Sequence, residues 1–356
     1  MAELAIDYKK RIQQTFLPPQ GNKYWRLEDL IGHNNIRYFS FGRHALAEGL
    51  IVAGVKKDDR VLLPGFICRD VLSAVNSIGA VAVYYDVGRD LRMSTPLEDL
   101  PNAKAIIAVN YFGFPQDLVP FIEYCKSNSA VLIEDNAHGL FSCDKDSKLL
   151  GTRGDVSIFS LRKTIPMPDG AALVVNNPHI ACKLKPQIPF NTKHESPSFK
   201  IKQGLRRLVP LIGATSIQSV ISCIRYFRKL RTSYEIYPSM SDNEYILPDH
   251  IAPCSGLLSY MASIDIVEEK IRRRELYIWV DTLIRHLDCE PVFETLHEQV
   301  VPYCYPFYAK PSEIRRIKAV LKGHSIYCLK WPALPKAIES TTHDHYKNMW
   351  LVQLLW

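Results

Sequence analysis

Short apolar runs alternate with amphipathic stretches from Tyr38 to about Asn177. The apolar runs are rich in Val, Ile, Leu and Ala, which is typical of buried strands. They predict strands at Val61–Leu63, Val81–Tyr85, Ala105–Val109, Ala130–Glu134, Val156–Leu161 and Ala172–Val175. Stretches between several of them carry apolar residues every three or four positions and predict helices, among them Ala45–Val55, Arg69–Ser77 and Leu118–Ser127. This alternation predicts an α/β domain with a largely parallel sheet.

The remaining chain divides into an arm and a second, smaller unit. The first 35 residues mix charges and include Pro18-Pro19, which indicates an N-terminal arm. The C-terminal part begins with a long helical pattern at Gly256–His286, and strand-like stretches follow near Val301–Tyr308 and Ser325–Leu329. The predicted organisation is an arm at 1–35, a large domain at 36–250 and a small C-terminal α/β domain at 251–356.

Composition favours a folded protein of a reducing compartment. A chain of 356 residues with 47% hydrophobic residues can bury a core large enough for two domains. The nine cysteines form no C-x-x-C pair, so buried thiols are expected rather than disulfides or zinc ligands. Charged residues near the N-terminus do not fit a secretory signal, and no window of about 20 apolar residues predicts a spanning helix. We expect a cytoplasmic protein.

The net charge of +7 is unevenly distributed. Between Ala181 and Tyr234 there are eleven Lys or Arg residues and a single acid, Glu195. A solvated basic face is the simplest interpretation. The alternative is a surface that attracts anions, such as a nucleotide diphosphate or membrane headgroups. No nucleic-acid-binding motif accompanies the stretch, so nucleic acid is not an expected partner.

Three features follow predicted strands, where open α/β sheets bind their ligands. The first is Phe41-Gly42-Arg43-His44, in which a glycine precedes a helix whose free N–H groups could receive a phosphate. The second is Asp135, at the end of an apolar strand; such a carboxylate is often structural, but it could pair with a protonated heterocyclic nitrogen. The third is Lys163, in a short loop between two apolar strands. A buried lysine has a lowered pKa and can act as an amine nucleophile.

Together these features supply what pyridoxal 5′-phosphate (PLP) requires of a protein. The lysine would form the Schiff base, the carboxylate would keep the pyridine nitrogen protonated, and the helix start would hold the phosphate. A lysine displaced by substrate could then move a proton as general base and acid. The pair His343 and His345 has no further ligands in view, so no metal is expected.

The order of these motifs resembles the DegT/DnrJ/EryC1/StrS family of PLP-dependent sugar aminotransferases. The similar stretch runs from about Tyr38 to Asn177, with a fainter match at 255–335. Its segments are D-D-R-V-L-L-P-G-F at 58–66, V-N-Y-F-G at 109–113, I-E-D-N-A-H at 133–138 and G-T-R-G-D-V-S-I-F-S at 151–160. The resemblance implies the fold-type-I PLP-transferase architecture, with a large mostly parallel α/β domain and a smaller C-terminal domain.

Carried over by position, the resemblance assigns a role to each candidate residue. Asp135 would pair with the pyridine nitrogen, His138 would lie near the phenolic oxygen, and Lys163 would form the Schiff base. The phosphate would be held by Ser160 and by the turn at Gly42, Arg43 and His44. Members often place a stacking aromatic where this chain has Cys68, and Phe66 could replace it. This chain also has only Leu161 and Arg162 between the serine and the lysine, fewer than the family usually has.

The leading hypothesis is an aminotransferase that converts a nucleotide-linked keto sugar to an amino sugar, with glutamate as the expected amino donor. The resemblance implies that substrate class, and it also implies a homodimer, because such enzymes build each active site at a subunit boundary. One alternative is a PLP-dependent sugar dehydratase on the same fold. Another is a non-catalytic regulatory or interaction protein, against which the presence of both Lys163 and Asp135 argues.

Overall fold

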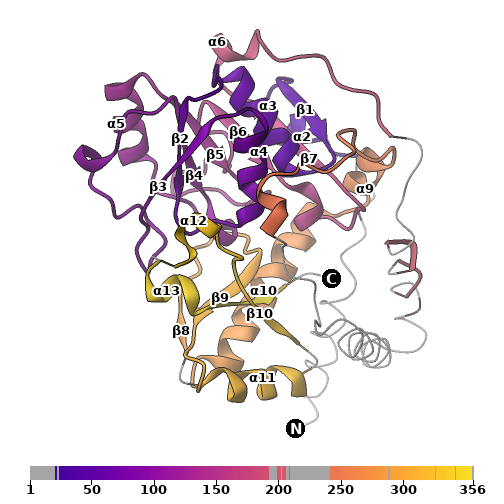
Figure 1. The fold of residues 1–356 in the computed structure, drawn as a ribbon. Coiled ribbons are helices and arrows are strands. Elements are labelled where there is room, and N and C mark those ends of the chain that lie inside the picture. The colour runs from indigo at the N-terminus through magenta and orange to yellow at the C-terminus, as the bar shows by residue number, and fades with distance from the viewer. Residues whose placement is uncertain are drawn as a thin grey trace.

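Two sheets organise the chain (Figure 1). The computed structural model describes residues 21, 24–191, 199–201, 203–205, 208, 241–287, 289–324, 326–340 and 342–354. The larger sheet has seven strands in the order β1-β7-β6-β5-β4-β2-β3. Their bounds are β1 Ile36–Phe39, β2 Arg60–Pro64, β3 Val81–Tyr85, β4 Ala105–Val109, β5 Val131–Asp135, β6 Val156–Phe159 and β7 Ala171–Val175.

Five of these strands form the parallel body of the sheet. Strands β3, β2, β4, β5 and β6 pair in parallel, whereas β7 runs antiparallel to both β6 and β1. All five residues of β4 and all five of β7 are buried, as expected for strands covered on both faces. The predicted α/β architecture with a mostly parallel sheet is therefore confirmed. Strand β1 was not predicted, because its sequence Ile-Arg-Tyr-Phe lacks a continuous apolar run.

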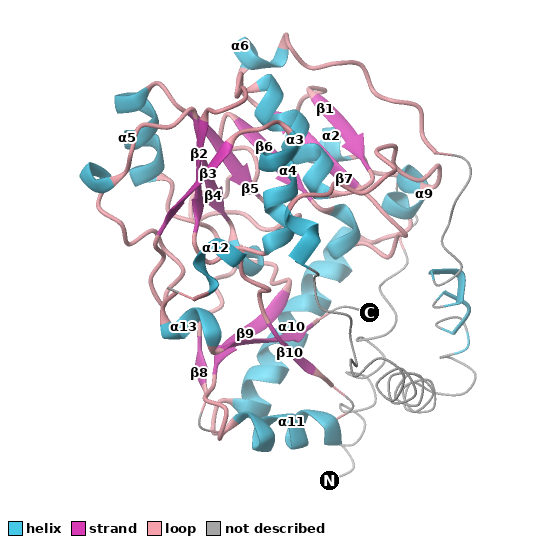
Figure 2. Cartoon of the chain, viewed as in Figure 1, coloured by secondary structure: helices cyan, strands magenta, loops and turns pink. Residues whose placement is uncertain are grey.

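Helices connect and cover the large sheet (Figure 2). Helix α3 packs on β6 and β7, α4 lies beside α3, and α5 packs on β4 and β5. The bounds are α2 Leu27–Ile31, α3 Gly42–Val52, α4 Leu72–Ser77, α5 Val119–Asn128 and α6 Pro178–Ala181, with 3-10 turns η1 Arg69–Val71, η2 Leu97–Asp99, η3 Tyr111–Gly113, η4 Leu161–Lys163 and η5 Ser241–Glu244.

The smaller sheet is antiparallel and belongs to the C-terminal part of the chain. Its order is β10-β11-β9-β8, and α10 and α11 lie next to it (Figure 1). The strands are β8 Glu290–Pro291, β9 Cys304–Tyr308, β10 Cys328–Lys330 and β11 Met349–Gln353, and the helices are α9 Leu257–Ala262, α10 Ile266–Ile284, α11 Ile314–Gly323, α12 Lys336–Glu339 and α13 Asp344–Lys347.

The long helical pattern at 256–286 is two helices. Helix α9 ends at Ala262, and α10 begins after Asp265, whose side chain accepts a hydrogen bond from the Glu268 N–H at 3.1 Å. An aspartate in this position satisfies a free N–H of the first turn and marks a helix start. The break matters because α9 packs with the large sheet, where Leu257 and Met261 join the cluster that contains Leu161.

Most of the basic stretch at 181–234 and most of the predicted arm lie outside the described residues. Within the described ranges, no helix has the length and apolar character needed to cross a bilayer.

The burial of β4 sets a stability prediction. Ile106 is fully buried in β4, and its truncation to alanine leaves a cavity that the surrounding strands cannot close, so Ile106→Ala should cost about 2–5 kcal/mol of unfolding free energy. Val81 on the edge strand β3 is 46% exposed, and Val81→Ala should cost about 0.5 kcal/mol or less. Urea denaturation of both variants measures the difference. Equal losses in the two variants would contradict this account of the core.

Candidate active site

The ends of three neighbouring strands bring the predicted residues together. Asp135 is the last residue of β5, and Lys163 ends the 3-10 turn η4 that follows β6. Because β4, β5 and β6 run parallel, their carboxyl ends meet at one edge of the sheet. The start of α3 reaches the same edge, since a Cβ added to Gly42 would lie 3.8 Å from the Cβ of Ser160.

The lysine loop is held by hydrogen bonds and by two apolar anchors. The Lys163 N–H donates to the Ser160 carbonyl at 3.0 Å, and the Arg162 N–H donates to the Gly170 carbonyl at 3.2 Å. Leu161 and Ile165 on either side of the lysine are fully buried. The loop therefore has little freedom, and the direction of the lysine side chain is set by the backbone.

The Lys163 amine lies 3.0 Å from Nε2 of His138. On the other side of that ring, the Phe112 N–H donates to Nδ1 at 3.3 Å. Burial lowers the pKa of His138 well below its usual value, so the ring is neutral and carries one proton. Since Nδ1 accepts a hydrogen bond, the proton is on Nε2, which then donates to Lys163. An amine can accept this hydrogen bond only as the free base.

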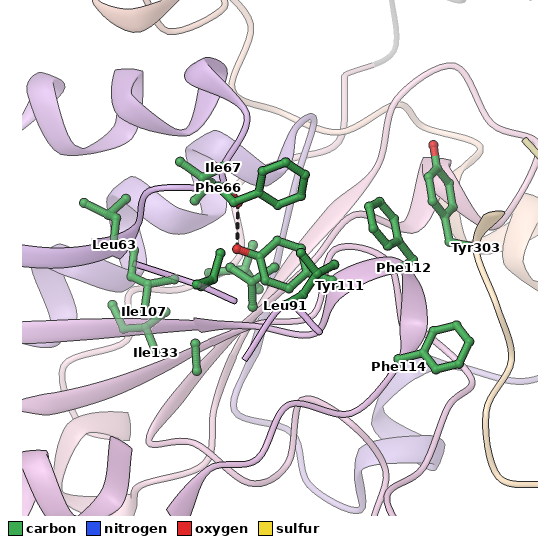
Figure 3. Close-up of a cluster of buried hydrophobic side chains, with 14 of the residues drawn as sticks. Leu63, Phe66, Ile67, Leu91, Ile107, Tyr111, Phe112, Phe114, Ile133 and Tyr303 are labelled. Atoms are coloured by element: carbon green, nitrogen blue, oxygen red, sulfur yellow. Dashed lines mark hydrogen bonds between the residues drawn. The ribbon is translucent and has the colours of Figure 1, made fainter. Parts of the chain in front are cut away.

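The backbone at Phe112 is what directs its N–H toward His138. Phe112 has φ 59° and ψ 16°, a left-handed conformation that costs a residue with a Cβ about 1–3 kcal/mol. The same conformation turns the Phe112 carbonyl toward the Tyr303 N–H, which donates to it at 2.8 Å. Figure 3 shows Phe112 and Tyr303 beside one another, the first from η3 and the second from the C-terminal part. The strain is thus compensated at the site by two hydrogen bonds.

Aromatic rings fix the orientation of His138. Its ring stacks on Tyr303 with centroids 4.5 Å apart and an interplanar angle of 8°, and on Phe112 at 5.7 Å and 11°. Trp331 contacts it edge-on at 6.0 Å. Neither Tyr303 nor Trp331 was predicted as a site residue, because neither lies in a motif that indicates PLP binding.

Burial acts oppositely on the two ionisable groups that face each other. It raises the pKa of the Asp135 carboxyl, while the charge of Lys163 and the Ala137 N–H oppose that change. It lowers the pKa of the Lys163 amine, while the charges of Asp135 and Cys68 oppose the change. Each group's charge acts on the other, so the two belong to one electrostatic site.

A buried polar network lies behind Asp135. Glu134 is fully buried and accepts hydrogen bonds from the backbone N–H groups of Arg153 and Gly154, from the Arg153 guanidinium at 2.7 Å and from the Asn110 amide at 2.8 Å. The network joins the ends of β4 and β5 to the loop before β6. From the sequence, no such role was assigned to Asn110 and Arg153, although they lie within the motifs at 109–113 and 151–160.

The start of α3 combines free N–H groups with unpaired polar atoms. The first N–H groups of a helix have no acceptor within it. His44, in the first turn, is buried, and its Nε2 has no hydrogen-bond partner among the described residues. The Arg43 guanidinium lies 3.8 Å from the Asp70 carboxylate. The central guanidinium carbon of Arg43 lies 5.8 Å from the centre of the Phe41 ring, and that of Arg162 lies 5.0 Å from it. The glycine needs no left-handed backbone here, so its role is not a sharp turn.

Phe66 and Cys68 have different surroundings. Phe66 is fully buried and packs against Tyr111, Trp331 and Tyr346, and its carbonyl accepts from the Tyr111 hydroxyl at 2.6 Å (Figure 3). Cys68 is partly buried; burial raises the pKa of its thiol, and the charges of Lys163 and Arg43 act against that rise. Cys68 therefore lies beside the lysine, and Phe66 belongs to the aromatic core behind it.

A cavity of about 1310 Å³ opens elsewhere, between α5 and the loop before β9. Tyr111 and Arg153 line it, but Lys163, Asp135 and His138 do not. Its walls carry charges of both signs, among them Arg92, Lys148, Asp117 and Glu298. It is separate from the strand-end site.

Comparisons with known proteins agree with this geometry. The model of the DegT/DnrJ/EryC1/StrS aminotransferase family matches residues 25–194. A curated relative, the GDP-perosamine synthase of Escherichia coli O157:H7, is 28% identical over 176 residues, which are 47% of this chain and 48% of that protein. The matched region contains every strand of the large sheet and each of the predicted site residues. Residues 25–194, just under half of the chain, are thus similar to the DegT/DnrJ/EryC1/StrS aminotransferase family. The chain matches about half the length of that curated relative.

Solved structures of sugar aminotransferases share the fold over nearly the whole chain. A sugar aminotransferase from Micromonospora echinospora has a TM-score of 0.61 at 15% identity and covers 98% of this chain and 92% of its own. A protein from Streptococcus pneumoniae, assigned as a sugar aminotransferase and solved in its PLP form, has a TM-score of 0.60 at 15% identity. That alignment covers 98% of this chain and 91% of the other protein. The predicted fold class is confirmed by these likenesses.

The burial of the lysine predicts an unusual titration. Burial disfavours the ammonium form, so the Lys163 amine should titrate below the ordinary lysine pKa of about 10.4 and hold more free base at neutral pH. Competitive labelling with trace acetic anhydride across a pH series, read peptide by peptide by mass spectrometry, gives its midpoint, and exposed Lys310 serves as the internal reference. A midpoint for Lys163 at or above that of Lys310 would contradict the assignment.

Proposed function

We propose that the chain is a PLP-dependent aminotransferase that converts a nucleotide-linked keto sugar to an amino sugar. The observation that carries the proposal is the placement of the Lys163 amine and the Asp135 carboxylate in one partly buried site, with His138 held 3.0 Å from the amine. The match of residues 25–194 to the aminotransferase family model supports the reaction class.

The residues present fit PLP. The amine of Lys163 is available as the free base, and the buried Asp135 carboxylate has no cation within ion-pair distance among the described residues. A protonated ring nitrogen would supply one. The unpartnered Nε2 of buried His44 and the first N–H groups of α3 suit a phosphate, with Arg43 and Ser160 close by. We assign Lys163 to the aldehyde, Asp135 to the ring nitrogen and the α3 start with Ser160 to the phosphate.

PLP, when bound, supplies an aldehyde for the amino group and a ring that accepts electrons. The protein's own part is positioning and proton transfer. Asp135 stays ionised beside a positive ring nitrogen. Lys163 starts as a free amine, so it can take up and return a proton at its Nζ, and the lowered pKa keeps this possible near neutral pH. His138, fixed by the Phe112 N–H and by two ring stacks, holds the Nζ in place.

The nucleotide-sugar substrate and the glutamate donor are part of the proposal. The relative named GDP-perosamine synthase supports a nucleotide-linked sugar. The same fold also includes a GDP-4-keto-6-deoxymannose-3-dehydratase, at 16% identity and a TM-score of 0.56, so a dehydratase is the alternative outcome. The presence of Lys163 favours amino transfer, because a lysine can return a proton to the aminated carbon.

We also propose a homodimer and the division of the chain into an arm at 1–35, a large domain at 36–250 and a small domain at 251–356. The large sheet lies within 36–175 and the small sheet within 290–353, which supports the division. An exposed apolar face of α10, formed by Val267, Ile271 and Ile278, supports a further subunit contact.

The lysine assignment is tested by covalent trapping. Borohydride treatment of the protein loaded with PLP should add the mass of the reduced cofactor to the peptide that contains Lys163 and to no other. Lys163→Arg keeps the positive charge but removes the amine nucleophile, so it should take up no stable label. A label on another lysine in the wild-type protein would refute the assignment.

Amino transfer is tested by a half-reaction. Adding glutamate to the PLP-loaded protein should move the absorbance of the bound cofactor from the visible to the near ultraviolet. Asp135→Asn should slow this change by about 100-fold or more, because the cofactor ring accepts electrons less readily when no carboxylate keeps its nitrogen protonated. Exposed Asp99→Asn is the matched control and should react at the wild-type rate. A non-catalytic protein would show no spectral change with any amino acid.

A further inference from the structure

A buried arginine of the C-terminal part contacts the backbone of the lysine loop. Arg273 on α10 is 1% exposed, and its Nε lies 2.6 Å from the Glu269 carboxylate one turn earlier. Glu269 also pairs with Arg272 at 2.6 Å. Burial alone would raise the pKa of the Glu269 carboxyl, but Arg273 and Arg272 together hold it below its usual range. The cluster is therefore charged and buried.

The guanidinium of Arg273 uses its remaining N–H groups on two backbone carbonyls. Nη2 donates to the carbonyl of Thr164 at 3.0 Å, and Nη1 donates to the carbonyl of Pro302 at 3.5 Å. Thr164 directly follows Lys163 in sequence. Pro302 directly precedes Tyr303, whose ring stacks on His138 at 4.5 Å. A single planar group thus joins the two segments that place the amine and its histidine neighbour.

Two buried guanidinium groups pair with one buried carboxylate in the interior. Burying a charge costs free energy, and apolar side chains of similar size often stabilise a core as well or better. A fork of N–H donors with fixed geometry can, however, hold two carbonyls at set positions, which an apolar side chain cannot do. The cost is explained if the arrangement serves the site.

We propose that Arg273 is a positioning residue for Lys163. It holds the carbonyl after the lysine and the carbonyl before Tyr303 in fixed relation, so that the Lys163 amine stays against His138 and out of water. The catalytic consequence rests on the proposed function, but the effect on the lysine itself does not require bound PLP. Helix α10 would in this way couple the C-terminal part of the chain to the lysine loop.

Arg272 provides a matched control on the same helix. It is buried to a similar degree and pairs with the same carboxylate, but it donates to the carbonyl of Leu354 at 3.5 Å, which lies in the C-terminal part and not in the lysine loop. Loss of either arginine removes one partner of Glu269. Only loss of Arg273 releases Thr164 and Pro302.

The test compares Arg273→Met, Arg273→Lys and Arg272→Met in the full chain, first without PLP. Competitive labelling should show the pKa of Lys163 shifted upward toward about 10.4 in Arg273→Met, because a released loop lets water reach the amine. Arg273→Lys keeps the positive charge but loses the planar set of N–H donors. An upward shift of the Lys163 pKa in this variant would therefore come from the changed geometry and not from the loss of a cation. Arg272→Met should leave the pKa of Lys163 at its wild-type value. All measurements are made below the thermal unfolding midpoint of each variant.

A second measurement is the apparent PLP affinity, followed by the absorbance of the bound cofactor. We expect it to fall about tenfold or more in Arg273→Met, and less in Arg273→Lys, with no change in Arg272→Met. Should Arg273→Met fail to fold, Arg273→Lys decides: an unshifted Lys163 pKa in that variant would overturn the proposal. Equal shifts in Arg272→Met and Arg273→Met would also overturn it. If the wild-type chain binds no PLP while the shifts in pKa appear as expected, the proposed function fails and the positioning role stands.

Discussion

The candidate site depends on holding an amine and a carboxyl group together where water reaches neither freely. Burial disfavours the charged form of both Lys163 and Asp135, and each partly restores the other's charge. The balance leaves the amine ready to react and the carboxylate ready to accept a cationic partner. Other features around the edge of the large sheet keep these two groups at that position.

The supporting features come from distant parts of the sequence. The ion pair between Glu134 and Arg153 fixes the end of β5. The strained backbone at Phe112 directs its N–H to Nδ1 of His138 and so sets the tautomer of that ring. From the C-terminal part, Tyr303 stacks on His138 and Arg273 holds the carbonyl after the lysine. A local motif supplies the reactive groups, and long-range packing supplies their geometry.

This division explains what the sequence could predict. The apolar strands of the large sheet were located almost to the residue, because a continuous apolar run has few other interpretations. Strands β3 and β4 match their predicted bounds. Strand β1 and the break between α9 and α10 were missed, since Arg37 interrupts the first pattern and Asp265 is a cap in the middle of the second. Lys163 and Asp135 were proposed as site residues because they lie at or after the ends of such strands. Tyr303 and Arg273 could not be found, because their contacts depend on how the C-terminal part packs on the large sheet.

The most direct measurement is a crystal structure of the chain with PLP bound. The account predicts continuous electron density from Lys163 Nζ to the cofactor, with a carboxylate oxygen of Asp135 about 2.7–2.9 Å from the ring nitrogen, as in other charge-assisted hydrogen bonds. It would be contradicted by PLP bound elsewhere, or by a Lys163 side chain that points into solvent while Asp135 contacts only protein.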